Sequence, residues 1–202
     1  MLLIGAVAGL AALLPAVVSA VEEAEYRVLL EDGPFELREY APSIVAETAV
    51  DANFEDAGNR AFRTLFRYID GNNVAQKEIA MTAPVSQEPS SEKIAMTSPV
   101  EQRASESGWV VSFMMPSSYT METIPQPSDP AVRLRAIPAY RAAAIRYSGF
   151  WSEARYREHL QELTAWIERQ GLETAGDPVW ARYDPPFKPW FMRRNEILIP
   201  VR

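Results

Sequence analysis

The 202-residue chain contains no cysteine, a single histidine, and nine glycines that form no nucleotide-binding loop. The lack of cysteine excludes disulfides, iron–sulfur clusters, thiolate catalysis, Cys-based zinc sites and covalent haem attachment. No GxGxxG or GxxxxGK pattern occurs, so the common phosphate-binding loops are missing. No nucleophile motif precedes the one histidine, His159. These absences predict a protein that binds a ligand rather than an enzyme.

Positive charge is scarce as well. The chain has 20 Lys and Arg residues against 27 Asp and Glu residues, which gives a net charge of −7. A protein that binds nucleic acid needs a basic face to neutralise phosphates. We therefore expect no nucleic-acid partner.

The first twenty residues, MLLIGAVAGLAALLPAVVSA, carry no charge, whereas the segment after them is acidic. The apolar run ends in Val18-Ser19-Ala20, a small-x-small cleavage pattern. Residues 1–20 therefore predict a signal peptide and an exported protein, periplasmic or secreted. No Lys or Arg precedes the run, and residues 2–20 come close to the roughly 20 residues that span a bilayer. An uncleaved membrane anchor, or a buried N-terminal helix, stays open; an anchor would be the only contact with a membrane.

Period-two alternation dominates residues 21–202, which we expect to form one domain. The segments YRVLLED and FELREY flank Gly33-Pro34 and predict a hairpin. Further strands are expected in the segments SIVAETAV, GWVVSFMMP, AVRLRAIPA, YRAAAIRYSG and NEILIPV.

Two stretches have the spacing of amphipathic helices. Phe54–Ile69 follows two candidate caps, Asp51 and Asn53, and Trp151–Gln170 ends before Gly171. Each has an apolar stripe on one side and charged residues on the other. We expect both helices to pack against a sheet.

A seven-residue block occurs twice. IAMTAPV at Ile79–Val85 returns as IAMTSPV at Ile94–Val100, with one Ala replaced by Ser. Alternate residues of a strand share a face, and the linker between the copies is polar. The pair predicts an antiparallel hairpin that directs Met81 and Met96 into one interior.

A larger repeat is also present. Strand–helix–strand occurs as SIVAETAV, the first helix and EIAMTAPV, and again as YRAAAIRYSG, the second helix and EILIPV. We therefore predict an α+β fold in which duplicated βαβ-type halves form a curved antiparallel sheet, or distorted barrel, with two outer helices.

The two IAMT blocks, together with RYDPPFKPWFMRRNEILIP near the C-terminus, resemble the SOUL haem-binding protein family. The resemblance extends from about Tyr26 to Arg202 and identifies residues 21–202 as one SOUL haem-binding domain. It implies a duplicated barrel similar to the gyrase-inhibitor-like effector-binding fold. It also implies a ligand, which is haem or a porphyrin-like molecule bound without a covalent link.

The resemblance implies a haem cleft against the first helix, where the matching positions are Asn59, Phe62 and Phe66. A porphyrin needs an apolar slot and cations for its propionates, which Phe62 and Phe66 with Arg63 would supply. Two large residues at the boundary of a sheet would have the same pattern. Met81 and Met96 could line the pocket, or they could fill the core.

Two further groups are candidates for ligand contacts. Lys188, Trp190, Arg193 and Arg194 could pair with carboxylates and cover a ligand face, or they could hold a rigid proline-bounded loop. His159 is the only imidazole that could ligate iron, at the boundary of the second helix's apolar stripe. We expect it to be a surface-edge residue instead.

These observations predict a non-enzymatic protein that binds haem or a related tetrapyrrole in an apolar cleft, for carriage or buffering. An effector-binding module for amphipathic small molecules is the alternative from the same fold. A haem-degrading enzyme is the third, and it would need a reductant and oxygen.

Overall fold

The structure is a computed structural model that describes residues 21–76 and 90–202. This part of the chain contains thirteen strands, two α-helices and one 3₁₀ helix. The strands are β1 (Glu22–Glu23), β2 (Tyr26–Asp32), β3 (Phe35–Tyr40), β4 (Ser43–Val50), β5 (Asn73–Val74), β6 (Thr97–Ser98), β7 (Val100–Ser105), β8 (Gly108–Met114), β9 (Gln126–Pro127), β10 (Arg133–Ile137), β11 (Tyr140–Tyr147), β12 (Val179–Arg182) and β13 (Asn195–Val201). The helices are α1 (Phe54–Ile69), α2 (Glu153–Gln170) and the 3₁₀ helix η1 (Trp190–Met192).

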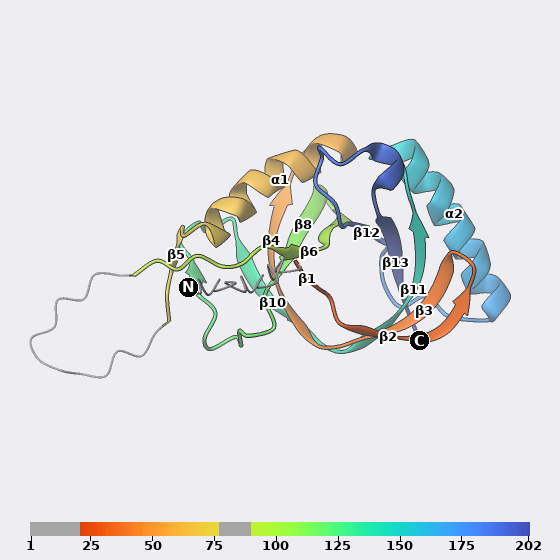
Figure 1. Cartoon of the computed structure of the whole chain (residues 1–202), viewed down its shortest axis with the longest axis horizontal. Coiled ribbons are helices and arrows are strands. Elements are labelled where there is room, and N and C mark those ends of the chain that lie inside the picture. Colours follow the sequence, from red (N-terminus) through yellow and green to blue (C-terminus); the bar gives the residue numbers. More distant parts are fainter. Residues whose placement is uncertain (1–20, 77–89) are drawn as a thin grey trace, which may run out of the picture.

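Nine of the strands form one curved sheet in the order β10-β4-β8-β7-β12-β13-β11-β3-β2. Neighbouring strands are antiparallel throughout. The sheet curls into a half-barrel with α1 and α2 on its outer, convex side (Figure 1). This confirms the predicted curved antiparallel sheet with two outer helices. Within the described residues, no helix is long and apolar enough to cross a membrane.

The helix boundaries follow from their caps. The Asn53 side chain accepts a hydrogen bond of 2.8 Å from the Asp56 backbone N–H, so Asn53 rather than Asp51 caps α1. In α2 the cap is Ser152, so the helix begins at Glu153, two residues later than predicted. Gly171 ends α2 in the left-handed conformation, with φ of 66°.

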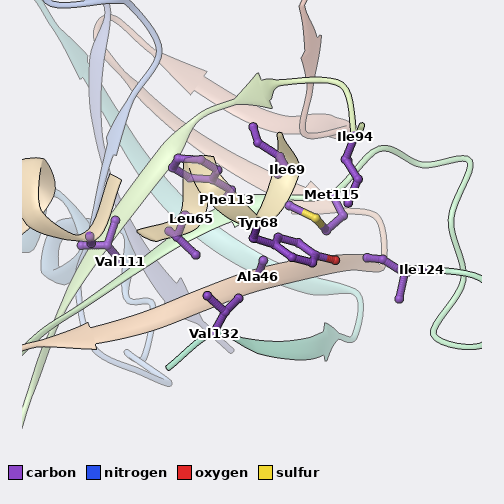
Figure 2. Close-up of a cluster of buried hydrophobic side chains, with 11 residues drawn as sticks. Ala46, Leu65, Tyr68, Ile69, Ile94, Val111, Phe113, Met115, Ile124 and Val132 are labelled. Carbon is purple, nitrogen blue, oxygen red and sulfur yellow. The ribbon is translucent and has the colours of Figure 1, made fainter. Parts of the chain in front are cut away.

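Each helix covers one half of the sheet. Ala61, Leu65 and Tyr68 of α1 pack against Ala46 of β4 and Phe113 of β8 in a fully apolar cluster (Figure 2). The second cluster joins α2 to β11 and β13 and contains these buried residues: Ala143, Ile145, Leu163, Trp166, Ile197 and Ile199. The two cores lie on the convex side, so the concave side must be filled differently.

The duplication is real, but its unit is larger than βαβ. In the first half, β4 leads through α1 to the β7–β8 hairpin; in the second, β11 leads through α2 to β12 and β13. Beneath α1 the strand beside β4 is β8, and beneath α2 the strand beside β11 is β13, so β8 corresponds to β13. Because β4–β8 and β11–β13 are antiparallel, each half is strand–helix–strand–strand.

The repeated block does not behave as predicted. The first copy, Ile79–Val85, lies outside the described residues. In the second copy Thr97–Ser98 forms the short strand β6, which pairs in parallel with β1, and Val100 begins β7. Pro99 lacks a backbone N–H and separates β6 from β7. The alternating strand that was predicted through Ile94–Val100 is therefore wrong.

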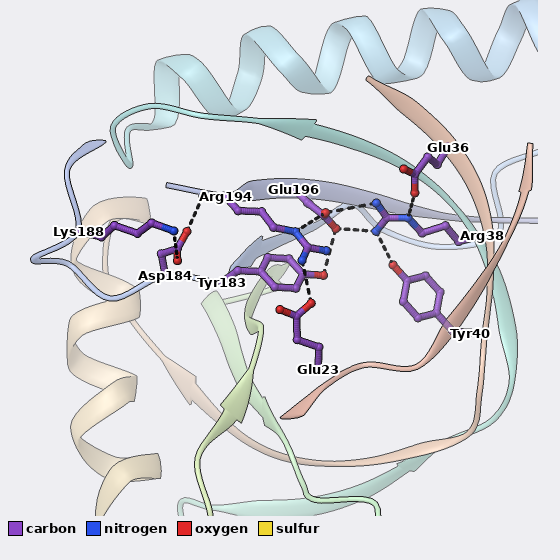
Figure 3. A network of polar contacts seen from close by, with 9 residues as sticks. All are labelled: Glu23, Glu36, Arg38, Tyr40, Tyr183, Asp184, Lys188, Arg194 and Glu196. Carbon is purple, nitrogen blue, oxygen red and sulfur yellow. Dashed lines mark hydrogen bonds and ion pairs between the residues drawn. The ribbon is translucent and has the colours of Figure 1, made fainter. Parts of the chain in front are cut away.

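A buried ion network occupies the concave side (Figure 3). Arg38 of β3 contacts Glu196 of β13 at 2.6 Å, and the two side chains are 1% and 0% exposed. Strand β11 lies between them, and its residue beside Arg38 is Ala142. A larger side chain there would obstruct the path of the guanidinium.

Glu196 connects further residues to this pair. It accepts hydrogen bonds from Arg194 at 2.9 Å and from the Tyr183 hydroxyl at 3.0 Å. Burial opposes ionisation of Glu196, but the adjacent Arg38 and Arg194 outweigh it and hold the pKa of this carboxyl below its usual value. The network thus joins β3 and β13 through full charges.

We expect Glu196→Gln to lower the free energy of unfolding by roughly 3–5 kcal/mol, because it leaves Arg38 and Arg194 short of a buried countercharge. Urea denaturation at pH 7 measures this. Since the pKa of Glu196 is depressed in the folded state, its contribution is present above the ordinary glutamate pKa, about 4.5, and is lost as the pH falls through the folded pKa. The difference from wild type should therefore shrink in acid.

The control is Glu153→Gln, which removes an exposed pair with Arg157 on α2. Its effect should stay within about 0.5 kcal/mol. Equal losses in both variants would contradict the role assigned to the network.

Candidate functional site

A large hollow lies on the concave side of the sheet. It has a volume of about 1480 Å³ and is lined by residues of β1, β4, β7, β8 and β10 and by the start of β11. Its apolar and aromatic lining includes Ile44, Val45, Met114, Ile137, Tyr40 and Tyr140. The rings of Tyr40 and Tyr140 stack with centroids 5.0 Å apart. We call this hollow the concave cleft.

Two glutamates of the concave cleft have opposite environments. Glu47 contacts Arg135 at 2.9 Å and Arg103 at 3.4 Å. Burial opposes its ionisation, but these arginines prevail and lower its pKa. Glu101 forms no ion pair with any described residue and receives only a 3.4 Å hydrogen bond from Ser112. Burial raises the pKa of Glu101.

The rim of the concave cleft is acidic. Glu22, Glu23, Glu25 and Asp177 lie along it, and both arginines inside the cleft are paired with Glu47. A hollow with this charge attracts cations and repels a ligand with two carboxylates. The cleft can therefore hold a flat or amphipathic cation, with Glu101 as its countercharge.

The predicted residues on the first helix lie elsewhere, on the convex side. The rings of Phe62 and Phe66 stack with centroids 5.8 Å apart, and Phe62 also meets Phe113 edge-on at 5.3 Å. Phe62 is 36% exposed and Phe66 is 43% exposed. Asn59 and Arg63 are exposed on the same flank. The structure brings these four residues together as an open aromatic surface, which we call the α1 face.

The methionines do not join this surface. Met96 is partly buried and packs against the apolar cluster beneath α1, so it fills the core rather than lining a ligand site. Met81 lies outside the described residues.

The C-terminal cations are largely occupied within the chain. Lys188 contacts Asp184 at 2.6 Å, and Arg194 pairs with Glu23 and Glu196. Arg193 donates to the backbone carbonyls of Lys188 and Pro186. These contacts favour the alternative interpretation, in which the segment that carries these cations is a rigid proline-bounded loop. Trp190 differs, because it is 48% exposed and stacks on Phe150.

His159 lies on α2, on the other half of the sheet from the α1 face. Its Nδ1 is 3.0 Å from Glu162, and its ring lies 4.0 Å from that of Tyr147. Residues 21–76 and 90–202 contain no group of three His, Asp or Glu side chains that could hold a metal ion. His159 is therefore engaged at the surface of α2, away from both candidate surfaces.

Sequence reasoning missed the concave cleft. Glu101, Tyr40 and Tyr140 stand in alternating strands, and alternation shows that a strand has two faces without showing which face is hollow. The acidic residues that precede β2 were the only available signal.

Comparisons with known proteins show the family to which this chain belongs. The profile of the family described as SOUL heme-binding protein matches residues 21–200. Heme-binding protein 1 of Xenopus tropicalis is 26% identical over 166 residues, which cover 81% of each chain. Heme-binding protein 2 of Mus musculus is 28% identical over 178 residues, which cover 82% of this chain and 81% of that one.

Solved structures share the fold at much lower identity. The EcmrR C-terminal domain is 13% identical, with a TM-score of 0.58, and the match covers 88% of this chain and 98% of that domain. A protein described as a hydrolase from Listeria innocua is 12% identical, with a TM-score of 0.53 over 86% of this chain and 94% of the other. These likenesses concern the fold alone.

The raised pKa of Glu101 gives a prediction with a defined sign. A folded state that raises a carboxyl pKa is most favoured below the ordinary value of about 4.5, and it loses that advantage as the pH rises through the folded pKa. Glu101→Gln cannot ionise, so the variant does not lose this stability as the pH rises. We expect the variant to be more stable than wild type at pH 7.5 but not at pH 4, as measured by urea denaturation. Glu106→Gln, in the exposed β7–β8 turn, should show no such crossover.

Proposed function

The chain belongs to the SOUL heme-binding protein family, and from this membership we propose that it binds haem or a related tetrapyrrole without catalysing a reaction on it. The observation that carries the proposal is the family match over residues 21–200. The relatives named heme-binding proteins 1 and 2, which align over about four fifths of their length, support it.

We place the tetrapyrrole on the α1 face. Phe62 and Phe66 present stacked, half-exposed rings, and a porphyrin needs an apolar surface of this kind. Arg60, Arg63 and Arg67 make α1 locally basic in an acidic chain, which suits a ligand with two propionates. The acidic concave cleft has the wrong charge for such a ligand.

In this proposal most of the affinity comes from apolar contact, at about 25 cal/mol per Å² of area removed from water. His159 is not needed as an iron ligand, because it lies on α2 beside Glu162 and Tyr147. A surface site also allows uptake and release without opening of the fold, which suits carriage or buffering.

We further propose that the protein acts after export. The family match begins at residue 21, directly after the predicted leader, and this supports treating residues 1–20 as a separate targeting segment. A periplasmic or secreted carrier would meet its ligand outside the cytoplasm.

Titration of haemin into the purified protein should give a shifted, saturable Soret band at micromolar ligand. Phe66→Ala should weaken binding roughly tenfold, because it removes ring area at the site, whereas His159→Ala should change it less than twofold. The Soret band should persist when a reductant and oxygen are added. Loss of the Soret band under those conditions would indicate that the protein degrades haem. If haemin gives no shifted Soret band at all, the proposal is wrong.

A second candidate function has its own observation. The concave cleft of about 1480 Å³, with the Tyr40–Tyr140 stack and the unpaired Glu101, suits an amphipathic cation. In this alternative the protein is an effector-binding module, which is the use implied for the similar gyrase-inhibitor-like fold. The two functions require opposite ligand charge and different faces of the sheet.

Crystal violet, a flat lipophilic cation, separates these functions. If the concave cleft is the ligand site, the dye should raise the melting temperature of wild type, and Glu101→Gln should abolish the rise. Phe66→Ala is the matched control and should leave the rise unchanged. Thermal scans with and without dye measure this; a rise that survives in Glu101→Gln would reject the cleft as the cation site.

A further inference from the structure

Arg182 ends β12 and points to the convex side, next to α1. Its guanidinium lies 4.8 Å from the centre of the Trp180 ring and 5.2 Å from that of Trp151. The side chain of Trp180 lies on the same face of β12, because alternate residues of a strand share a face. The arginine is thus held against two indole rings at the junction of β12, α1 and the segment before α2.

The opposite side of the guanidinium meets the backbone of α1 at Gly58. A Cβ atom at this position would lie 2.1 Å from Nη2 of Arg182 and 2.6 Å from Nη1. No side chain fits there while the guanidinium keeps its place. Glycine inside a helix lowers helix stability by about 1 kcal/mol relative to alanine. The chain therefore gives up some stability of α1 at the position where the Arg182 guanidinium packs against its backbone.

Among the described residues, Arg182 has aromatic neighbours but no carboxylate partner. It makes no hydrogen bond or ion pair with any described residue, and its Nε is buried with no acceptor. Burial lowers the pKa of Arg182 to about 10. Arg38, which is fully buried, contacts Glu36 and Glu196. Arg182 is only partly buried, but a cation that loses water without gaining a countercharge is still destabilising, so its unpaired state needs a reason.

The surroundings of Arg182 add positive charge. Arg193 lies 4.6 Å over the same Trp151 ring and donates hydrogen bonds to two backbone carbonyls. Arg155 also has a buried Nε without an acceptor. The acid of the first turn of α1 on this flank is Glu55, which is exposed and forms no ion pair with Arg182. An anion that reached this point would meet several guanidinium groups.

The position of Arg182 relative to the α1 face suggests which anion. Gly58, Phe62 and Phe66 are spaced four residues apart, so they follow one flank of α1 at intervals of about 6 Å. A flat molecule lying on the two rings would bring a substituent at its edge to the Gly58 end of that flank. Arg182, whose guanidinium approaches Gly58, is partly exposed.

We propose that Arg182 is the anchor for the carboxylate of a flat aromatic ligand that lies along Phe62 and Phe66. This deepens the proposed function, since it uses the same α1 face and names the group that would receive a propionate. The fork of the guanidinium suits a carboxylate, and Trp151 and Trp180 keep it in position. The carboxylate of the ligand supplies the countercharge that Arg182 lacks among the described residues, which gives a reason for an unpaired arginine at this position.

The test uses two pyrene probes that differ only in charge, 1-pyrenebutyrate and 1-pyrenebutanol, titrated by fluorescence. Wild type should bind the carboxylate at least about tenfold more tightly than the alcohol, the effect of one charge-assisted pair. Arg182→Gln should remove this preference while leaving the alcohol unaffected, and Arg182→Lys should keep part of it. The control is Arg169→Gln, the same charge change at an exposed position in the last turn of α2, which should keep the full preference.

Stability gives an independent readout. Because Arg182→Gln removes a partly buried cation that has no carboxylate partner among the described residues, its urea midpoint should rise while the preference for the carboxylate disappears. A lower midpoint with the wild-type preference retained would assign Arg182 to the structure alone and overturn the proposal, as would a wild type that binds both probes equally.

Haemin separates this inference from the proposed function. If wild type fails to bind haemin but still prefers pyrenebutyrate through Arg182, the carboxylate anchor stands and the haem proposal fails. If haemin binds wild type and Arg182→Gln equally well, haem binding stands and the anchor is wrong.

Discussion

The fold depends on a set of charges placed where a curved sheet would otherwise have an apolar interior. Arg38 reaches across β11 to Glu196, and both side chains are almost fully buried. A pair of this kind stabilises the fold only when every charge is matched, and here Tyr40, Tyr183, Glu36 and Arg194 supply the remaining contacts. The network ties β3 to β13 and occupies the concave side of the second half, whereas the concave cleft opens mainly along the strands of the first half.

This arrangement divides the molecule into two chemical environments. Inside the half-barrel, glutamates, paired arginines and stacked tyrosines make a hollow that suits a cation. Outside it, the apolar residues beneath α1 and α2 form the cores, and the α1 face remains uncovered beside cationic side chains. The two sides of one curved sheet therefore differ in charge, and the two proposed functions assign ligands of opposite charge to them.

Features that rest on neighbouring residues could be predicted from the sequence. The bounds of α1 follow from the 3.6-residue period and the cap at Asn53, and the β2–β3 hairpin follows from Gly33. Contacts across the chain could not be predicted, since Arg38 and Glu196 are 158 positions apart. The second IAMT block has the alternation of a strand, but Pro99 interrupts it. Arg182 could not be singled out either, because its contacts with Gly58 and two tryptophans, and the lack of a carboxylate beside it among the described residues, depend on the folded structure.

The two halves share a plan, and their differences point to one helix as the ligand site. In the second half, the β2–β3 hairpin extends beyond β11 and covers the flank of α2, where Phe35 stacks on Trp166 and Asp32 accepts its indole N–H. In the first half, the sheet ends at β10, and the described strands provide no such cover for Phe62 and Phe66. A duplicated fold thus buries the aromatic residues of one helix and leaves those of the other in water. Exposed stacked rings add little to the stability of the free protein, and the ligand proposed for the α1 face would cover them.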